Sequence, residues 1–446
     1  MTHHPTQIRR VYPSGPLHGS IRPPSSKYHT LRYILAAFLA SGTSLVNNPA
    51  QSDDTSVLLN ACRQLGASLR FDDPPLRPDE PYTLIVQGTG GHIQSPANGM
   101  LDVGNAGAVL RLLLGICALS PEPITLTTPY PQSLGRRPNA DLLQALRELG
   151  AEVHSPNEEG TLPIRISRGQ LHGGKVQVSG KKSSQYISSL LYLAPLLDEG
   201  LEIEIVDALT SASFVDLTVG ILHEAGITVI EQEPRGYYGV PGKQQYQSRS
   251  YNIPGDYPSA AALLAAVAVA KGEVRITFLS PQDRDGEVLL EVFSHMGVDI
   301  RRDGQKVIAR CEGPLKGIAL NGNLTIDSVP VIAAAACFAT EPSRIYNVAN
   351  LRLKESDRIY DLAKELGKLG CRITPHEDAL EIEPMGAEGM HGGVCVDAHS
   401  DHRLIQALAI AGLGSKQPVT IEHAEHIAKS YPDFFSDLMA LGARIE

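Results

Sequence analysis

A segment that reads as a helix, a glycine and a short strand recurs six times along this chain. Two of the copies are LQALRELGAEVHS and LAKELGKLGCRIT, and each places its glycine directly before an alternating strand pattern. The separations between successive repeat glycines are 84, 76, 71, 73 and 72 residues, for Gly66, Gly150, Gly226, Gly297, Gly370 and Gly442. So regular a spacing indicates a repeated structural unit. Glycine suits the left-handed backbone position that ends a helix before a strand.

Each repeat also carries a second helix that is apolar on most of its faces. Examples are AVLRLLLGICAL, AALLAAVAVA and LIQALAIAGLG. Helices of this kind must be buried within the protein. The predicted unit is therefore strand, buried helix, strand, amphipathic helix, glycine, strand. Six such units of about 74 residues account for the whole chain of 446 residues.

Two arrangements of the repeats are compatible with this length. One is a solenoid, and the other places three repeats in each of two globular lobes. The segment YNIPGDYPSA, which contains proline and glycine near the middle of the chain, is the predicted crossing between lobes.

Composition excludes several classes of partner. Acidic residues outnumber basic ones, 49 to 39, so we expect no broad cationic surface for nucleic acid or acidic lipid. The six cysteines are scattered without a metal-binding spacing, which favours a reducing cytoplasm and predicts no metal site. The apolar stretch YILAAFLA is too short to span a bilayer and is interpreted as a buried helix. Any anion that the protein binds should be small and held locally.

Polar loops before the apolar helices carry most of the residues suited to chemistry. These loops are SSKYHTLR, VGNAG, GKKSSQ, TIDS and SDHR, and each lies at a predicted helix N-terminus. Free backbone N–H groups make that end of a helix a natural seat for phosphate or carboxylate. Capping alone explains Asn105, Asp327 and Asp401 taken singly. Capping does not explain why the same loops repeatedly contain a lysine, an arginine or a glutamine as well.

The stretch NLRLKESDRI, residues 350–359, packs both signs of charge against the start of a predicted helix. Such runs are most often solvated surface. Lys354 and Arg358 are four residues apart, so they share one face of a helical turn and can contact an anion. Glu355 points elsewhere and can take part in proton transfer. The combination indicates an enzyme that binds anions and moves protons.

Taken together, the motifs resemble the EPSP synthase (3-phosphoshikimate 1-carboxyvinyltransferase) family over essentially the whole chain. They are SSK, DVGNAG, GRRP, SSQ, D-x-x-PVIA, LKESDRI, DHR and AKSYPDFF, in that order. The resemblance implies an α/β (α+β) fold of two lobes, each of three βαβαββ units with buried helices. The lobes are expected at residues 25–247 and at 1–24 plus 248–446, with the active site in the cleft between them.

The resemblance also implies a reaction and a set of site residues. Enolpyruvyl passes from phosphoenolpyruvate to the 5-hydroxyl of shikimate 3-phosphate, phosphate is released, and no metal or organic cofactor takes part. A cytoplasmic monomer is the family's usual form. The residues implied for phosphoenolpyruvate are Lys27, Asn105, Gly107, Arg137, Gln185, Arg358, Arg403 and Lys429. Those implied for shikimate 3-phosphate are Arg32, Ser183, Ser184, Gln185, Ser211, Asp327, Asn350 and Lys354.

The reaction needs two proton movements. Phosphoenolpyruvate is protonated at its methylene carbon while a hydroxyl attacks the neighbouring carbon, and the adduct then expels phosphate. We expect Asp327 to be the base for the hydroxyl, and Glu355 with Lys27 to deliver the proton to carbon. The cations would stabilise the charge that shifts through the adduct.

Three positions depart from the family pattern and leave alternatives open. Tyr28 stands where a serine or threonine is usual, Ala108 where a threonine is common, and Phe214 where a tyrosine or histidine is found. A paralogue that acts on a related cyclic phosphate is therefore one alternative. A non-catalytic anion-binding protein of the same fold is another. The sister family that uses UDP-N-acetylglucosamine is disfavoured, because YPQSLGRRP lacks a cysteine before its G-x-R-P motif.

Overall fold

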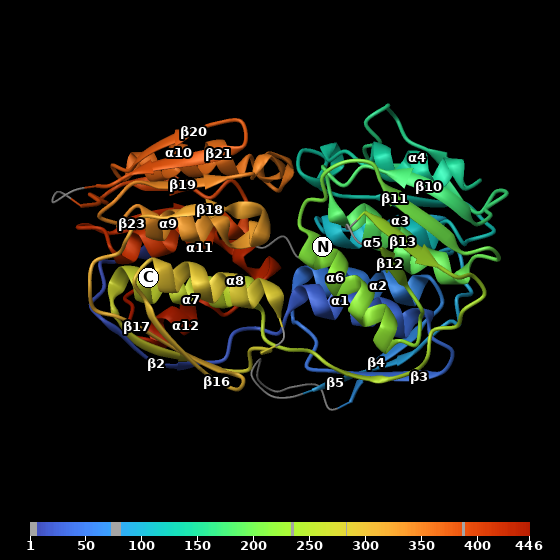
Figure 1. Cartoon of the computed structure of the whole chain (residues 1–446), viewed down its shortest axis with the longest axis horizontal. Helices are drawn as coiled ribbons and strands as arrows, with labels where there is room; N and C mark the ends of the chain where they lie inside the picture. The colour runs from blue at the N-terminus through green and yellow to red at the C-terminus, as the bar shows by residue number, and fades with distance from the viewer. Residues whose placement is uncertain (1–6, 73–81, 233–235, 282, 386–388) are drawn as a thin grey trace. The chain divides into compact units, whose positions relative to one another are not determined.

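The computed structural model describes residues 7–72, 82–232, 236–281, 283–385 and 389–446. The chain forms two compact units (Figure 1). The middle unit is Ser25–Ile253, and the terminal unit is Pro254–Glu446 together with the residues up to Pro24. The chain thus leaves the terminal unit after Pro24 and returns to it at Pro254.

One repeat of the middle unit has all of its elements in sequence order. They are β10 (Gly174–Val178), α5 (Ser184–Leu193), β11 (Leu201–Ile205), α6 (Ala212–Glu224), β12 (Ile230–Gln232) and β13 (Tyr237–Val240). β10 and β11 run parallel, and β13 pairs antiparallel with both β11 and β12. The sheet order is β10-β11-β13-β12. The parallel pair requires a crossover, which α5 supplies.

A second repeat of the middle unit has the same sheet order, β6-β7-β9-β8. Its elements are β6 (Met100–Asp102), α3 (Gly107–Cys117), β7 (Ile124–Thr127), α4 (Ala140–Glu148), β8 (Glu152–His154) and β9 (Ile164–Ser167).

The third sheet of the middle unit, β14-β3-β5-β4, takes its first strand from the far end of the unit. β14 (Ser250–Asn252) pairs parallel with β3 (Thr43–Asn47) just before the chain crosses back. The other elements are α1 (Lys27–Leu39), α2 (Asp53–Gln64), β4 (Ser68–Asp72) and β5 (Thr83–Gln87).

In the terminal unit, β2 (Leu17–Ile21) is the first strand of the sheet β16-β17-β15-β2, and it pairs parallel with β15 (Gly272–Ile276). The rest of that repeat comes after the crossing: α7 (Tyr257–Ala270), α8 (Arg284–His295), β16 (Asp299–Asp303) and β17 (Lys306–Cys311). The next sheet is β18-β19-β21-β20. Its repeat contains β18 (Ala319–Asn321), α9 (Val329–Ala336), β19 (Ser343–Tyr346), α10 (Arg358–Lys368), β20 (Arg372–Pro375) and β21 (Ala379–Glu383).

The last repeat is completed by the N-terminal strand. β1 (Arg9–Val11) pairs antiparallel with β23 (Val419–Glu422), and Val11 also bridges to Ile445. The remaining elements are β22 (Cys395–Asp397), α11 (His402–Leu413) and α12 (Phe434–Ala440). The described residues therefore form six related sheets, three in each unit, which confirms the predicted α/β fold of six repeats.

The repeat glycines adopt the predicted backbone. All six have a positive φ, between 82° and 114°. At Gly150 a side chain is excluded for two reasons. The φ angle is +91°, and a Cβ would lie 2.4 Å from the backbone oxygen of Gln170. This glycine allows the chain to turn from α4 into β8.

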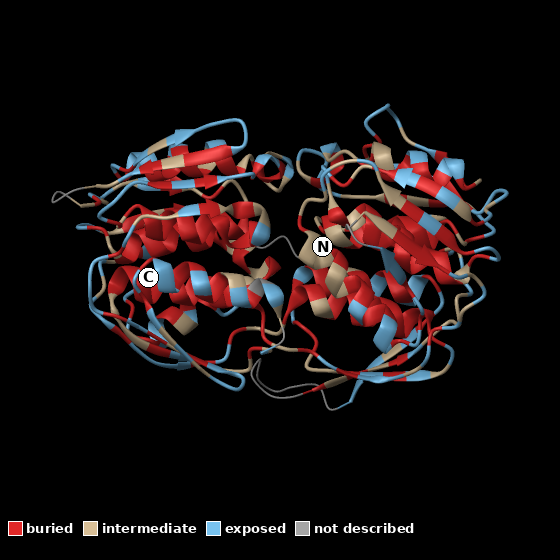
Figure 2. Cartoon of the chain, viewed as in Figure 1, coloured by how far each residue is buried: buried red, intermediate tan, exposed pale blue. Residues whose placement is uncertain are grey.

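The apolar helices form the cores of the units, as predicted. Every residue of α7 except Pro258 is buried, and α7, α9 and α11 pack against one another within the terminal unit. In the middle unit α3 packs against α5, and α5 against α6. Figure 2 shows the apolar helices mostly as buried, whereas α6 is buried along only part of its surface. None of the helices in the described part of the chain has the length and apolar character needed to cross a membrane.

Candidate active site

The dense charges of residues 350–359 divide into a structural pair and a buried network. Asp357 caps α10 by accepting the backbone N–H of Tyr360 at 3.1 Å, and Arg352 Nη1 lies 2.6 Å from the same carboxylate. Both Arg352 and Asp357 are partly exposed. The interpretation of such a charge run as solvated surface therefore holds for these two residues.

Arg358, the first residue of α10, is buried and binds two carboxylates. Its Nε and Nη2 atoms lie 2.8 and 3.1 Å from the two oxygens of Asp401, and its Nη1 atom lies 3.2 Å from Oδ1 of Asp327. Burial acts to lower the pKa of Arg358, but Asp401 and Asp327 outweigh it and raise the pKa. The guanidinium is therefore a fixed positive charge.

Asp327 is held between two cations at the start of α9. It lies in the 3-10 turn η4 (Ile326–Ser328), its side chain is buried, and Lys354 Nζ is 3.5 Å from the oxygen that also contacts Arg358. Two cations on one oxygen fix the orientation of the carboxylate.

Glu355 is the centre of a second buried cluster. His402 Nδ1 lies 2.9 Å from Oε2 of Glu355, and Lys429 Nζ lies 2.8 Å from Oε1. Lys429 ends the 3-10 segment η7 (Ala424–Lys429). Burial acts to raise the pKa of Glu355, but the charges of His402 and Lys429 outweigh it and hold the pKa well below its usual value. Glu355 is thus ionised.

Arg403 has unused hydrogen-bonding capacity. Its side chain is buried, with the residue 1% exposed, and Nη1 donates to Oε1 of Gln406 at 3.1 Å. Its Nε and Nη2 atoms, and Nε2 of Gln406, have no hydrogen-bond partner among the described residues. The same holds for Oδ1 of Asn350 and Oγ of Ser430. Buried polar groups are normally paired, so the donors of Arg403, Gln406 and Ser430 point to an anionic ligand, whereas the oxygen of Asn350 can accept from a hydroxyl group.

Glu355, Asp401 and His402 bring three possible metal ligands within 4.8 Å of one another. Both carboxylates already contact cationic side chains, Lys429 on Glu355 and Arg358 on Asp401. A divalent cation would have to displace or repel those charges. We therefore interpret the cluster as an ion-pair network, and the prediction of no metal site stays a prediction.

In the middle unit, Lys27 begins α1 and is buried. Its Nζ atom lies 3.3 Å from Oδ2 of Asp54 in α2, so the charge of Lys27 is partly balanced within the unit.

Gly107 and Arg137 are in direct proximity at the N-terminus of α3. A Cβ at Gly107 would lie 2.4 Å from Nη1 of Arg137. Ala106 supplies no side-chain cap to this helix. The absence of a side chain at Gly107 thus lets the guanidinium approach the helix end, where backbone N–H groups also attract anions.

Gln185 is positioned by an arginine that the sequence interpretation did not assign. Arg111 is buried in α3, and its Nη1 donates to Oε1 of Gln185 at 3.0 Å. Its Nε donates to Oδ1 of Asn139 at 3.1 Å, and Asn139 in turn donates to the backbone oxygen of Arg137 at 2.9 Å. Arg111 thus links Gln185 to the segment that carries Arg137.

The three serines implied for phosphate binding lie at the starts of α5 and α6. Ser183 caps α5 by accepting the N–H of Gln185 at 3.3 Å, and Ser184 is buried beside it. Ser211 precedes α6 with φ of +54° and ψ of +49°. A non-glycine residue in this region is strained, and such strain concentrates at functional sites.

Arg32 is not open to a ligand in this conformation. Its residue is 2% exposed, and its three nitrogens donate to Thr218, Tyr28 and Phe214. The resemblance implied a contact with the carboxylate of the substrate ring, and such a contact requires rearrangement.

The structure brings some of the predicted site residues into contact within each unit, among them Gly107 and Arg137 in the middle unit. In the terminal unit, ion pairs connect Asp327, Lys354 and Arg358, and a second set connects Glu355 and Lys429. Five further residues contact predicted site residues but were not assigned to the site from the sequence: Asp401, His402, Gln406, Arg111 and Asp54. The DHR motif was the available signal for the first two, but only its arginine was assigned.

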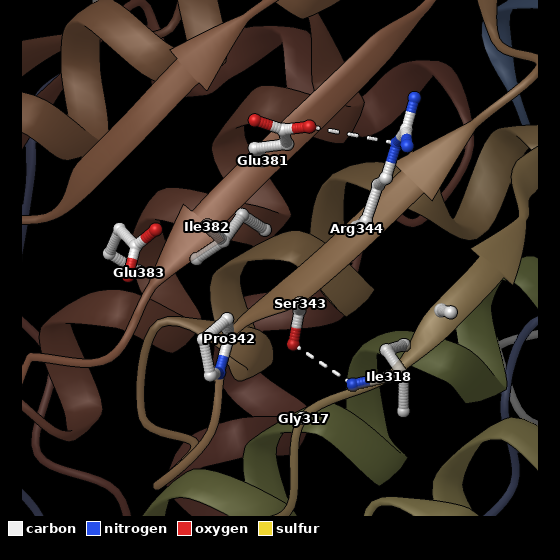
Figure 3. A pocket seen from close by; sticks show the side chains of 9 residues that line it. Gly317, Ile318, Pro342, Ser343, Arg344, Glu381, Ile382 and Glu383 are labelled. Atoms are coloured by element: carbon white, nitrogen blue, oxygen red, sulfur yellow. Dashed lines mark hydrogen bonds and ion pairs between the residues drawn. The ribbon is translucent and has the colours of Figure 1, made fainter.

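A surface pocket of about 400 Å³ lies elsewhere in the terminal unit, beside β19 and β21. Figure 3 shows its lining, which includes Arg344 and Glu381 in an ion pair of 3.7 Å. Both side chains of that pair are largely exposed, and no predicted site residue lines the pocket. It is separate from the candidate active site.

Comparison with known proteins identifies the family. The family model described as EPSP synthase (3-phosphoshikimate 1-carboxyvinyltransferase) matches residues 11–438. The chain belongs to this family. The 3-phosphoshikimate 1-carboxyvinyltransferase of Deinococcus radiodurans is 40% identical over 439 residues, covering 98% of this chain and 96% of the relative. That of Methanosarcina acetivorans is 37% identical and covers 96% of each chain.

Solved structures agree with this assignment. The EPSP synthase of Acinetobacter baumannii superposes with a TM-score of 0.78 at 26% identity, covering 99% of this chain and 100% of that one. The enolpyruvyl transferase NikO from Streptomyces tendae gives a TM-score of 0.76 at 19% identity, covering 99% of this chain and 98% of that one, and shows a shared fold.

Proposed function

We propose that this chain transfers the enolpyruvyl group from phosphoenolpyruvate to the 5-hydroxyl of shikimate 3-phosphate and releases phosphate, a step toward aromatic amino acids. Membership of the EPSP synthase family supplies the reaction. The observation that carries the proposal is the buried set of two carboxylates, Asp327 and Glu355, each held by cations in the terminal unit. A protein that only binds anions has no need of two carboxylates beside them.

The cations bind the charges of phosphoenolpyruvate. Nε and Nη2 of Arg403 have no partner among the described residues, and a phosphate or carboxylate would satisfy them. In this proposal Arg358 and Lys429 act with it in the terminal unit, and residues of the middle unit act on the same substrate: Lys27, Asn105, Gly107, Arg137 and Gln185. The reaction as proposed needs no metal or organic cofactor, because side chains carry all of the positive charge.

Asp327 is the proposed base that removes the proton from the attacking hydroxyl. A general base must be held in one orientation within hydrogen-bond reach of its proton. Arg358 and Lys354 hold the carboxylate in that way.

Glu355 and the cations around it handle the proton at the methylene carbon. Because the pKa of Glu355 lies well below its usual value, this carboxylate starts as a base. It is suited to take the proton that leaves the methyl group when the adduct expels phosphate. In the addition step the ionised Glu355 has no proton to give, so we assign the proton that reaches the methylene carbon to the ammonium group of Lys27, with Glu355 acting beside it.

In this proposal the acceptor is held by hydroxyl, amide and cationic side chains. Its phosphate contacts the helix-start hydroxyls of Ser183, Ser184 and Ser211, beside Gln185. Its ring contacts Asn350 and Lys354, and its carboxylate contacts Arg32. We further propose that the protein acts as a monomer in the cytoplasm.

A phosphate-release assay tests the proposal. The chain is incubated with phosphoenolpyruvate and one of three acceptors: shikimate 3-phosphate, shikimate or UDP-N-acetylglucosamine. Release that depends on shikimate 3-phosphate supports the proposal. Release with another acceptor contradicts the assigned acceptor, and ligand binding without release by any of them favours a non-catalytic anion-binding protein.

A further inference from the structure

Arg32 is a buried cation that has no counter-ion among the described residues. Nε donates to Oγ1 of Thr218 at 2.8 Å, Nη1 to the backbone oxygen of Tyr28 at 3.1 Å, and Nη2 to that of Phe214 at 3.2 Å. No carboxylate in the described part of the chain forms an ion pair with it. Burial consequently lowers the pKa of Arg32. A buried charge without an opposite charge is costly, so this site favours an anion.

Two aromatic rings lie beside this charge. Tyr28 and Phe214 are stacked, with ring centroids 4.4 Å apart and an interplanar angle of 29°. The Cζ atom of Arg32 is 5.8 Å from the centre of the Phe214 ring, so the negative face of an aromatic ring compensates part of the charge. The same two residues therefore hold Arg32 through their backbone oxygens, and the ring of Phe214 contacts it as well.

The pair also adjoins residues proposed to bind substrates. Tyr28 follows Lys27, and its ring centre lies 5.4 Å from the Nζ atom of Lys27. Phe214 lies in the first turn of α6, three residues after the strained Ser211, and is half-buried. The Phe214 ring thus contacts Arg32 and belongs to the same helix start as Ser211, one of the proposed acceptor phosphate contacts.

We propose that Tyr28 and Phe214 form a gate that selects the acceptor by its carboxylate. The carboxylate parts the two rings and takes over the role of counter-ion to Arg32. An acceptor without a carboxylate gains no such pairing and cannot offset the loss of the stack. This inference rests on the proposed function, which already gives Arg32 the acceptor carboxylate, and adds the two residues that the carboxylate must displace.

The first test measures affinity in a variant without the stack. Phe214→Leu keeps an apolar side chain and removes the ring, so opening the gate becomes easier. The dissociation constant for shikimate 3-phosphate, from titration calorimetry, should fall about 2- to 10-fold, the worth of an aromatic pair. The dissociation constant for phosphoenolpyruvate should not change. An unchanged or higher constant for shikimate 3-phosphate would overturn the gate.

A matched stack in the same unit provides the control. Tyr33 and Tyr251 are also stacked, with ring centroids 4.5 Å apart and an interplanar angle of 28°. The ring that contacts the guanidinium of Arg32 is that of Phe214, which is not part of this stack. Tyr251→Leu should leave both dissociation constants unchanged. A decrease equal to that of Phe214→Leu would show a general loosening of the unit and would overturn the gate as well.

The second test observes the ring directly. The chain contains no tryptophan, so Phe214→Trp creates a single fluorescent reporter at the gate. Its emission should change with shikimate 3-phosphate but not with the analogue whose carboxylate is replaced by a carboxamide. An unchanged emission at saturating shikimate 3-phosphate, or an equal change with the carboxamide, would overturn the inference. If the unaltered chain releases no phosphate with shikimate 3-phosphate, the proposed function itself fails.

Discussion

Arg358 directs its Nε and Nη2 atoms at the two carboxylate oxygens of Asp401, at 2.8 and 3.1 Å, and both side chains are buried. The third nitrogen of the guanidinium, Nη1, contacts Asp327. This bidentate geometry fixes the plane of the guanidinium. Asp401 therefore orients the cation that in turn orients the proposed base.

Loss of that pair should weaken the fold. Asp401→Asn leaves Arg358 buried with reduced compensation, and breaking a buried ion pair costs about 3–5 kcal/mol. We expect the free energy of unfolding in urea to fall by that amount. The control is Asp299→Asn, which breaks an exposed pair with Arg301 and should cost less than about 1 kcal/mol. Equal, small effects of both substitutions would contradict the structural role of Asp401.

A methyl group at Gly107 should weaken the binding of phosphoenolpyruvate. In Gly107→Ala the new Cβ would overlap Nη1 of Arg137, which can move because it ends a flexible side chain. We expect the dissociation constant for phosphoenolpyruvate to rise about 10-fold or more, the worth of one charge-assisted contact, with little change in stability. Gly220→Ala is the control, because a Cβ there meets nothing within 4 Å. An unchanged dissociation constant for Gly107→Ala would remove Arg137 from the proposed phosphoenolpyruvate site.

Gln406 should matter for affinity through Arg403. Gln406→Leu keeps the volume but removes the oxygen that accepts from Nη1 of Arg403. The KM for phosphoenolpyruvate should rise about 10-fold, while the KM for the acceptor and kcat change little. Gln406→Glu should also raise this KM, because a carboxylate would neutralise Arg403 before the substrate arrives. Unaltered KM values in both variants would contradict the role of Arg403.

The repeats, the buried helices and the fold class could be predicted because their signals are local. The glycine that ends an amphipathic helix and the apolar helix itself each occupy one short stretch of sequence. The loops before the buried helices could be singled out for the same reason. The sequence did not predict that strand β1 completes the last repeat, because its partner β23 lies at the other end of the chain.

The contacts that tune the site depend on tertiary structure. Asp401 is 43 residues from Arg358, and His402 is 47 residues from Glu355. Arg32 and Thr218 are 186 residues apart. From the sequence, Tyr28 and Phe214 are two separate departures from the family pattern, and the structure shows that they are one stacked pair. Pairings of this kind have no signal in a single sequence.

Acid should remove the stability that Glu355 contributes. Its pKa lies well below the usual 4.5, because His402 and Lys429 outweigh the effect of burial. Around pH 4.5 the unfolded chain therefore binds a proton that the folded chain does not. The contribution is complete above about pH 4.5 and is lost as the pH falls toward the folded pKa.

Glu355→Gln cannot make this contribution. The difference between its free energy of unfolding and that of the unaltered chain should be large near pH 7 and should shrink in acid, below about pH 4.5. Denaturant unfolding across this pH range measures it. A difference that stays constant throughout the range would contradict an ionised, stabilised Glu355.

The central claim is that the chain transfers enolpyruvyl to shikimate 3-phosphate with Asp327 as base, and phosphate release by Asp327→Asn tests it most directly. Asparagine keeps an oxygen for Arg358 and Lys354 but cannot take up the proton. With both substrates present, the unaltered chain should release phosphate. The variant should release it at least about 100-fold more slowly, while still binding phosphoenolpyruvate. Equal rates for the two proteins would contradict the claim.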